Sequence, residues 1–198
     1  MPALVHAQPP GHPLHLVQRG YCRAALFFCA RDRVAYLHWL GCCAVHSDCA
    51  VHAYVLMGNH VHLLATPYKA DGASLLMHVL AERYARYIER THGRCGPILE
   101  QRFKALMIRS SRHLLECMRY IELNPVRAHL AGAPDAYRWS SFRANALGYP
   151  DSLVTPHPTY YALGRTAAMR QAAYRQLFAI QSGRICTPRG ITRERNAD

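Results

Sequence analysis

The sequence has few acidic residues, no long apolar run and no C-x-x-C pair of cysteines. Its 198 residues include 12 Asp and Glu against 24 Lys and Arg, which gives a formal net charge of +12. A chain this basic indicates a polyanionic partner, most simply nucleic acid. The longest apolar stretches, such as residues 24–30 and 39–45, reach less than half of the roughly 20 residues that a membrane helix needs. The first twenty residues also lack the apolar core of a secretory signal, so we expect neither a membrane span nor export.

The eight cysteines include no C-x-x-C pair, which disfavours a structural zinc protein. Four of them lie in apolar stretches, and we expect them to be small core residues: Cys29, Cys42, Cys43 and Cys117. Because no export signal is evident, we expect the cysteines to be reduced. Hydrophobic residues make up 51% of the chain, which is enough to form the core of a folded domain.

Hydrophobic periodicity predicts an alternation of strands and helices. The expected strands lie at residues 13–19, 49–57, 60–65 and 104–109, and the expected helices at 32–45, from Ser74 to Gly93, from Ser110 or Ser111 toward Asn124-Pro125, and at about 166–181. Gly58-Asn59, between the second and third strands, is typical of a two-residue hairpin turn. The first six elements match the split βαβ, ferredoxin-like order. We therefore expect an α+β fold in which helices cover one face of an antiparallel sheet and the other face stays open for a ligand.

Two histidines on the expected strand 60–65, His60 and His62, are separated by one residue. Side chains alternate along a strand, so both histidines project from one face of the sheet, where two imidazoles can bind one metal ion. Val61 and Leu63 then point to the opposite face and pack against helices. In strand 49–57 the same alternation predicts one face with Val51, Ala53, Val55 and Met57 and another with His52, Tyr54 and Leu56. An H-x-H pair is a weak signal by itself, and a solvated polar strand face is the alternative.

The helix that begins near Ser110 combines an apolar stripe with a polar face. The stripe consists of Leu114, Met118 and Ile121, and the polar face carries, at intervals of four, Glu116, Tyr120 and Asn124. Tyr120 is therefore directed away from the core of its own helix, with an amide one turn further on. Two interpretations of Asn124 remain open: it ends the helix before Pro125 by bonding its own backbone, or it binds a ligand.

Taken together, His60-Val61-His62 and the block that begins at Tyr120 resemble the single-tyrosine HUH endonucleases, specifically the IS200-like, REP-associated tyrosine transposases. The likeness covers roughly residues 13–147. Its motifs are residues 18–20 (QRG), 53–64 (AYVLMGNHVHLL), 101–104 (QRFK), 120–128 (YIELNPVRA) and 139–141 (WSS). The family usually has a proline where Gly58 stands, an aromatic residue at Leu99 and a glycine at Gln101. These departures leave the catalytic set intact.

The resemblance implies a DNA transposase that nicks and rejoins single-stranded DNA. Tyr120 would attack the DNA, forming a 5′-phosphotyrosyl link and freeing a 3′-OH, and His60, His62 and Asn124 would bind Mg²⁺ or Mn²⁺. The partner would be single-stranded, hairpin-bearing DNA in a bacterial cytoplasm, near the nucleoid and away from membranes, and the protein a monomer or a dimer. No proton acceptor for Tyr120 is evident, and Glu116, one turn away, is the nearest candidate.

On this interpretation the chain divides into an irregular N-terminal segment at 1–12, a catalytic domain at 13–147 and a C-terminal extension at 148–198 with one helix and a basic tail. Four basic residues that flank the expected sheet face are predicted to contact DNA phosphates: Arg19, Arg23, Arg102 and Lys104. The alternative is a protein of the same fold that binds hairpin DNA or RNA without cleaving it. The intact catalytic set favours the enzyme.

Overall fold

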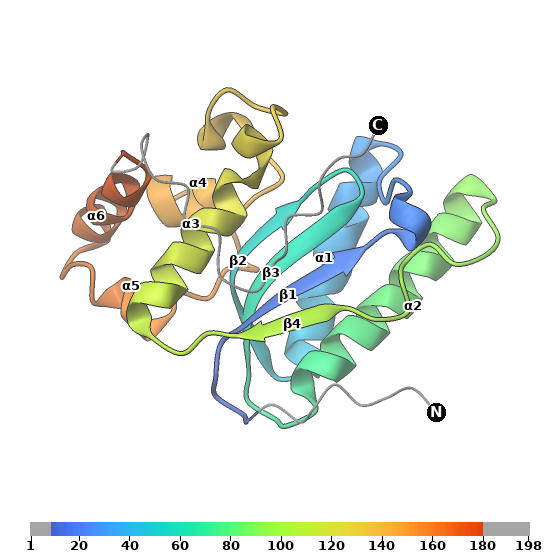
Figure 1. Ribbon diagram of the computed structural model, residues 1–198, viewed down its shortest axis with the longest axis horizontal. Coiled ribbons are helices and arrows are strands. Elements are labelled where there is room, and N and C mark those ends of the chain that lie inside the picture. The colour runs from blue at the N-terminus through green and yellow to red at the C-terminus, as the bar shows by residue number, and fades with distance from the viewer. Residues whose placement is uncertain (1–8, 180–198) are drawn as a thin grey trace.

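The computed structural model describes residues 9–179, which form one antiparallel sheet with helices on both of its faces (Figure 1). The elements are β1 (Leu14–Arg19), η1 (Tyr21–Arg23), α1 (Ala30–His46), β2 (Cys49–Leu56), β3 (His60–Pro67), α2 (Gly72–His92), β4 (Lys104–Met107), α3 (Ser111–Arg127), η2 (Pro134–Ala136), α4 (Phe142–Leu147), α5 (Pro158–Tyr161) and α6 (Ala167–Ala179). The start of the expected N-terminal segment and the basic tail lie outside the described residues. Among the helices that are described, none is long and apolar enough to cross a membrane.

The four strands follow the order β2-β3-β1-β4, and every neighbouring pair is antiparallel. This is the α+β, ferredoxin-like arrangement that the sequence predicts. Helices α1 and α2 pack together on one face of the sheet, behind the strands in Figure 1. Val61 and Leu63 of β3 point into this layer, where they share a core with Leu40 of α1 and Leu80 of α2. The alternation expected for β3 is therefore confirmed.

The opposite face of the sheet is covered in part, whereas the sequence predicts an open face. Helix α3 lies over β2 and β3, and α4, α5 and α6 gather around it (Figure 1). The second core that results contains the predicted stripe of α3 and residues of both strands: Ala53, Val55, Met57, Leu64, Leu114, Met118 and Ile121. Because β2 and β3 are apolar at successive positions, both of their faces need a cover. Among the strands only β4, at the edge, is exposed or half-buried along its whole length.

An irregularity in β2 exchanges its two faces. The register with β3 shifts between Val51 and Ala53, as at a β-bulge. As a result Val51 lies in the core under α1 and α2 together with Tyr54 and Leu56, and not with Ala53. The expected grouping of Val51 with Ala53 is therefore wrong, because strict alternation holds only where no extra residue enters the strand.

Helices α2 and α3 each have a boundary that differs from the sequence prediction, and the start of α3 agrees with it. Helix α3 begins after Ser110, whose side chain accepts a hydrogen bond within the first turn, as predicted. It does not end at Pro125 but continues to Arg127. Helix α2 begins at Gly72, slightly before Ser74. Proline disfavours the helical conformation of the residue before it, so the continuation of α3 needs a local compensation, which the side chain of Asn124 supplies.

The cysteines are only partly where the sequence places them. Cys43 and Cys117 are buried as expected, and so is Cys49, whereas Cys29 and Cys42 are exposed. Cys29 precedes the first turn of α1, and Cys42 lies off the buried stripe of that helix, so the prediction that both are core residues is wrong. All seven cysteines within the described residues are free thiols.

Candidate active site

The two predicted histidines lie at the start of β3, on the face covered by α3. Their ring centroids are 5.0 Å apart, so they project from the same side of the strand as the spacing predicts. His60 pairs with Arg19 at the end of β1, and His62 pairs with Val17. His62 is buried, with only 5% of its surface exposed, whereas His60 is half-buried. His60 is therefore the more accessible of the two.

The hairpin turn before β3 holds the ring of His60. Nδ1 of His60 lies 2.7 Å from Oδ1 of Asn59, and Nδ2 of Asn59 donates to the carbonyl of Arg23 at 3.3 Å. The second contact identifies the nitrogen of the amide, so the atom that faces His60 is an oxygen, which only accepts. Nδ1 of His60 therefore carries the proton, and Nε2 keeps a lone pair for a ligand.

A third histidine, to which no local sequence pattern points, joins this pair. Nε2 of His15, on β1, lies 2.9 Å from Nδ1 of His62, and the two rings stack with centroids 5.1 Å apart. His15 is 2% exposed. Its contact depends on the pairing of β1 with β3, which sequence spacing alone does not reveal.

Tyr120 of α3 faces two of these histidines, His62 and His15. The centroid of its ring lies 5.8 Å from that of His62 and 5.9 Å from that of His15. The guanidinium of Arg127 lies 5.1 Å from the centroid of the Tyr120 ring. The second core fixes this position, because Met118 and Ile121, on either side of Tyr120 in the sequence, are fully buried there. The structure thus brings Tyr120 and the H-x-H pair together from distant parts of the chain.

The electrostatics keep these side chains neutral. Burial lowers the pKa of His15 and of His60 to about 4, with smaller contributions from His113 and Arg19 respectively. Burial also holds the pKa of His62 well below its usual value. The pKa of the Tyr120 hydroxyl is raised by burial, against the opposing charge of Arg127. At neutral pH the site therefore presents uncharged imidazoles and a protonated phenol.

Asn124 uses its amide nitrogen on its own helix. Nδ2 donates to the carbonyl of Tyr120 at 2.9 Å and to that of Ile121 at 3.3 Å. The carbonyl of Ile121 is the one that the missing N–H of Pro125 would otherwise bond. These contacts support the backbone role of Asn124, and they leave its amide oxygen as the atom available to a ligand.

Between Tyr120 and Asn124, the buried carboxylate of Glu122 connects α3 to the C-terminal part of the chain. Oε1 of Glu122 accepts hydrogen bonds from Ser141 at 2.6 Å and from Asn145 at 2.9 Å. Oε2 accepts one from Tyr174 of α6 at 2.8 Å. Burial raises the pKa of Glu122 to about 7, although all three hydrogen bonds act in the opposite direction. A helix of the expected C-terminal extension thus contacts the helix that carries Tyr120.

The four predicted DNA-binding residues differ in their positions. Arg19 lies close enough to His60 and Tyr120 to affect the pKa of both groups. Its Nε is buried and has no hydrogen-bond partner among the described residues. The other three side chains are exposed, in the loop after β1 and along the segment that pairs with β1: Arg23, Arg102 and Lys104.

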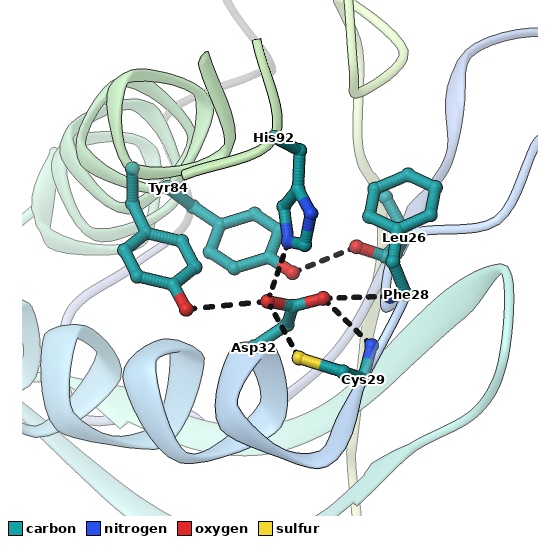
Figure 2. A network of polar contacts seen from close by, with 7 residues as sticks. Leu26, Phe28, Cys29, Asp32, Tyr84 and His92 are labelled. Carbon is teal, nitrogen blue, oxygen red and sulfur yellow. Dashed lines mark hydrogen bonds and ion pairs between the residues drawn. The ribbon is translucent and has the colours of Figure 1, made fainter. Parts of the chain in front are cut away.

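Elsewhere within residues 9–179, one group brings three side chains of metal-ligand type together: Cys29, Asp32 and His92. Figure 2 shows that hydrogen bonds already surround the carboxylate of Asp32. Its Oδ1 accepts from His92 at 2.9 Å, Tyr87 at 3.2 Å and Cys29 at 3.4 Å. Its Oδ2 accepts from the backbone N–H groups of Phe28 and Cys29. These hydrogen bonds connect the start of α1 to the end of α2, which gives the three residues a structural role.

Comparison with protein-family models gives no match, and comparison with curated proteins gives none either. Among solved structures the chain is similar to a REP-associated tyrosine transposase bound to a REP hairpin, with a TM-score of 0.61 and 18% sequence identity, over 80% of this chain and 96% of that one. A candidate transposase from Deinococcus radiodurans R1 gives a TM-score of 0.42 and 19% identity, over 56% of this chain and 88% of that one. The protein therefore has a transposase-like α+β fold. More particularly, it shares the fold of a REP-associated tyrosine transposase.

Proposed function

We propose that this protein is a metal-dependent endonuclease and transposase that cleaves and rejoins hairpin-bearing single-stranded DNA through a 5′-phosphotyrosine intermediate. The observation that carries the proposal is the approach of Tyr120 to His62, with ring centroids 5.8 Å apart, beside His60. A tyrosine that suits a nucleophile and two histidines that suit metal ligands thus come from separate elements to one region of the structure. The REP-associated tyrosine transposase that shares the fold is bound to a REP hairpin, which supports a hairpin substrate here.

The side chains of the site fit a divalent cation. His60 offers Nε2, because its Nδ1 proton is bonded to Asn59, and burial keeps both His60 and His62 neutral. The amide oxygen of Asn124 is the proposed third ligand. Mg²⁺ or Mn²⁺ held by these residues would polarise the scissile phosphate and stabilise charge on the leaving 3′-oxygen. Three neutral ligands would leave the whole charge of the ion to act on an anionic substrate.

Tyr120 carries the covalent step. Its hydroxyl oxygen forms a bond to phosphorus while the bond from phosphorus to the 3′-oxygen breaks, and the phenol loses its proton as the 3′-oxygen gains one. The reverse reaction with another 3′-OH rejoins the DNA without an external energy source. Glu116 is not favoured as the proton acceptor, because it is half exposed and bonded to Arg112 at 2.8 Å. Water or the leaving 3′-oxygen is the simpler acceptor.

Arg19 is the proposed contact for the phosphate at the cleavage point. Its Nε is a buried donor with no partner in the described part of the chain, and a buried donor of this kind is costly unless an acceptor arrives. A phosphate oxygen supplies such an acceptor and suits the planar guanidinium. Arg23, Arg102 and Lys104 would then follow the DNA backbone over the surface.

Incubation with end-labelled single-stranded DNA that carries a hairpin tests the proposal. With Mn²⁺ or Mg²⁺ we expect a protein–DNA adduct on a denaturing gel, and with EDTA we expect none. A protein that only binds the hairpin would shift it on a native gel and form no adduct with either metal. That result would contradict the proposed enzyme and favour the non-cleaving alternative.

A further inference from the structure

Each histidine of the proposed metal site has one ring nitrogen already in use. Nδ1 of His60 is bonded to Asn59, and Nδ1 of His62 lies 2.9 Å from Nε2 of His15. In both rings the nitrogen that remains is therefore Nε2. A metal-binding histidine commonly donates its other N–H to a second residue, which sets the tautomer and the orientation of the ring.

For His62 the direction of this hydrogen bond decides whether the ring can bind a cation. A single hydrogen bond joins the two ring nitrogens, so one imidazole donates its proton and the other accepts it. If His15 donated from Nε2, the proton of neutral His62 would sit on its own Nε2 and block that atom. If His62 donates from Nδ1, its Nε2 keeps a lone pair. Only the second arrangement is compatible with a metal ligand.

We propose that His15 is a positioning residue that accepts the Nδ1 proton of His62 and thereby presents Nε2 of His62 to the cation. This inference rests on the proposed function of the site. Nothing in the H-x-H motif points to His15, which lies on another strand. Asn59 accepts the Nδ1 proton of His60 in the same way. Its amide oxygen can only accept, which fixes the direction of that hydrogen bond.

The position of His15 argues against a direct ligand role. Its Nε2 is occupied by His62 at 2.9 Å, and its ring stacks on that of His62 with an interplanar angle of 23°. Only 2% of its surface is exposed, against 5% for His62. Because the His15 ring stacks on the His62 ring and is more deeply buried, it is well placed to fix the orientation of His62.

Two readouts independent of DNA cleavage test the proposal. The first is ¹⁵N NMR of the imidazoles in the metal-free wild-type protein, where we expect both His60 and His62 to carry the proton on Nδ1. The second is Mn²⁺ affinity, measured by the EPR signal of free Mn²⁺. His15→Phe keeps a flat ring but removes the acceptor, so we expect Mn²⁺ to bind about 10–100-fold more weakly. His15→Gln places an amide oxygen near the position of Nε2, and we expect it to restore most of the affinity.

A matched control is His52→Phe, which replaces another buried histidine of the sheet, bonded to Thr155 and Thr66 and not to the site. It should lose stability without weakening Mn²⁺ binding. The proposal is overturned if His62 carries its proton on Nε2, or if folded His15→Phe binds Mn²⁺ like the wild type. Equal losses in folded His15→Phe and His15→Gln would overturn it too, because they would make His15 a direct ligand. Mn²⁺ binding that depends on His15 in a protein that forms no adduct would support this inference and contradict the proposed nuclease.

Discussion

The amide nitrogen of Asn124 donates to the carbonyl of Ile121 at 3.3 Å, the carbonyl that Pro125 leaves without its usual helical partner. The side chain thus replaces part of the hydrogen bonding that a proline removes from a helix. This explains why α3 continues to Arg127. The same hydrogen bond directs the amide oxygen of Asn124 away from the helix backbone, because a backbone carbonyl can accept only from the amide nitrogen.

Two substitutions at Asn124 separate its backbone role from its proposed metal role. Asn124→Ala removes both the donor and the oxygen, so we expect a stability loss of about 1 kcal/mol and a higher Mn²⁺ requirement for cleavage. Asn124→Asp keeps an oxygen ligand but loses the donor, so we expect a comparable stability loss with a nearly unchanged Mn²⁺ requirement. Urea unfolding and a Mn²⁺ titration of adduct formation measure the two effects. An unshifted titration in Asn124→Ala would remove Asn124 from the metal site.

Tyr120→Phe tests the nucleophile. The change deletes one hydroxyl from a half-buried ring, so we expect adduct formation to disappear while hairpin affinity stays within twofold and stability changes by about 1 kcal/mol or less. Tyr68→Phe, on an exposed tyrosine away from the site, serves as the control and should form the adduct normally. Persistence of the adduct in Tyr120→Phe would assign the nucleophile to another residue.

The order of the strands and the approach of His60 to His62 could be predicted because both follow from local patterns. The alternation of side chains along one strand is enough to place two histidines on one face. His15 could not be found in this way, because its contact with His62 depends on the register between β1 and β3. A one-residue change of that register would turn His15 to the other face of the sheet.

The cover over β2 and β3 on the second face of the sheet could have been anticipated from the sequence. Ala53, Val55 and Met57 form one apolar row of β2, and Tyr54 and Leu56 belong to the other. Two apolar rows on one strand indicate cover on both sides. The exchange of faces at Val51 could not have been seen, since a β-bulge at this point has no glycine or proline to signal it.

The hydrogen bonds around the Asp32 carboxylate predict that the protein loses stability in acid. Burial alone would raise the pKa of this carboxyl, but the hydrogen bonds from His92, Cys29 and Phe28 together lower it from 3.8 to about 2. A folded-state pKa below the unfolded value means stabilisation that is complete above about pH 4 and is lost as the pH falls toward 2. Because the Asp32 carboxyl is buried, this shift of its pKa corresponds to about 2 kcal/mol of folding free energy.

Urea unfolding of the wild type and of Asp32→Asn between pH 6 and pH 3 measures this effect. We expect the difference in unfolding free energy to be constant from pH 6 to about pH 4.5 and to shrink below that. Asp135→Asn, on an exposed aspartate, should differ little from the wild type throughout. A difference that grows in acid would have the wrong sign for a depressed pKa.

The buried carboxylate of Glu122 predicts that α6 stabilises the helix that carries Tyr120. Glu122→Ala would leave the donors of Ser141, Asn145 and Tyr174 without their acceptor, so we expect a loss of about 2–4 kcal/mol. Tyr174→Phe removes one of the three bonds and should cost about 1–2 kcal/mol. Chemical denaturation of the two single variants and the double variant gives the coupling energy. Additive losses would show that the contact between Glu122 and Tyr174 contributes nothing of its own.

The net charge of +12 and the position of Arg19 predict how the protein binds DNA. We expect a hairpin with a single-stranded flank to bind more tightly than a blunt duplex of equal length, and the affinity for both to fall as salt rises, because phosphate contacts release counterions. Arg19→Gln should weaken binding and reduce the salt slope by about one unit, while Arg143→Gln, whose side chain bonds the carbonyl of Asp135, should leave the slope unchanged. Fluorescence anisotropy at several salt concentrations measures both quantities. Equal affinity for duplex and hairpin would contradict a site built for single strands, and an unchanged slope in Arg19→Gln would place the cleaved phosphate elsewhere.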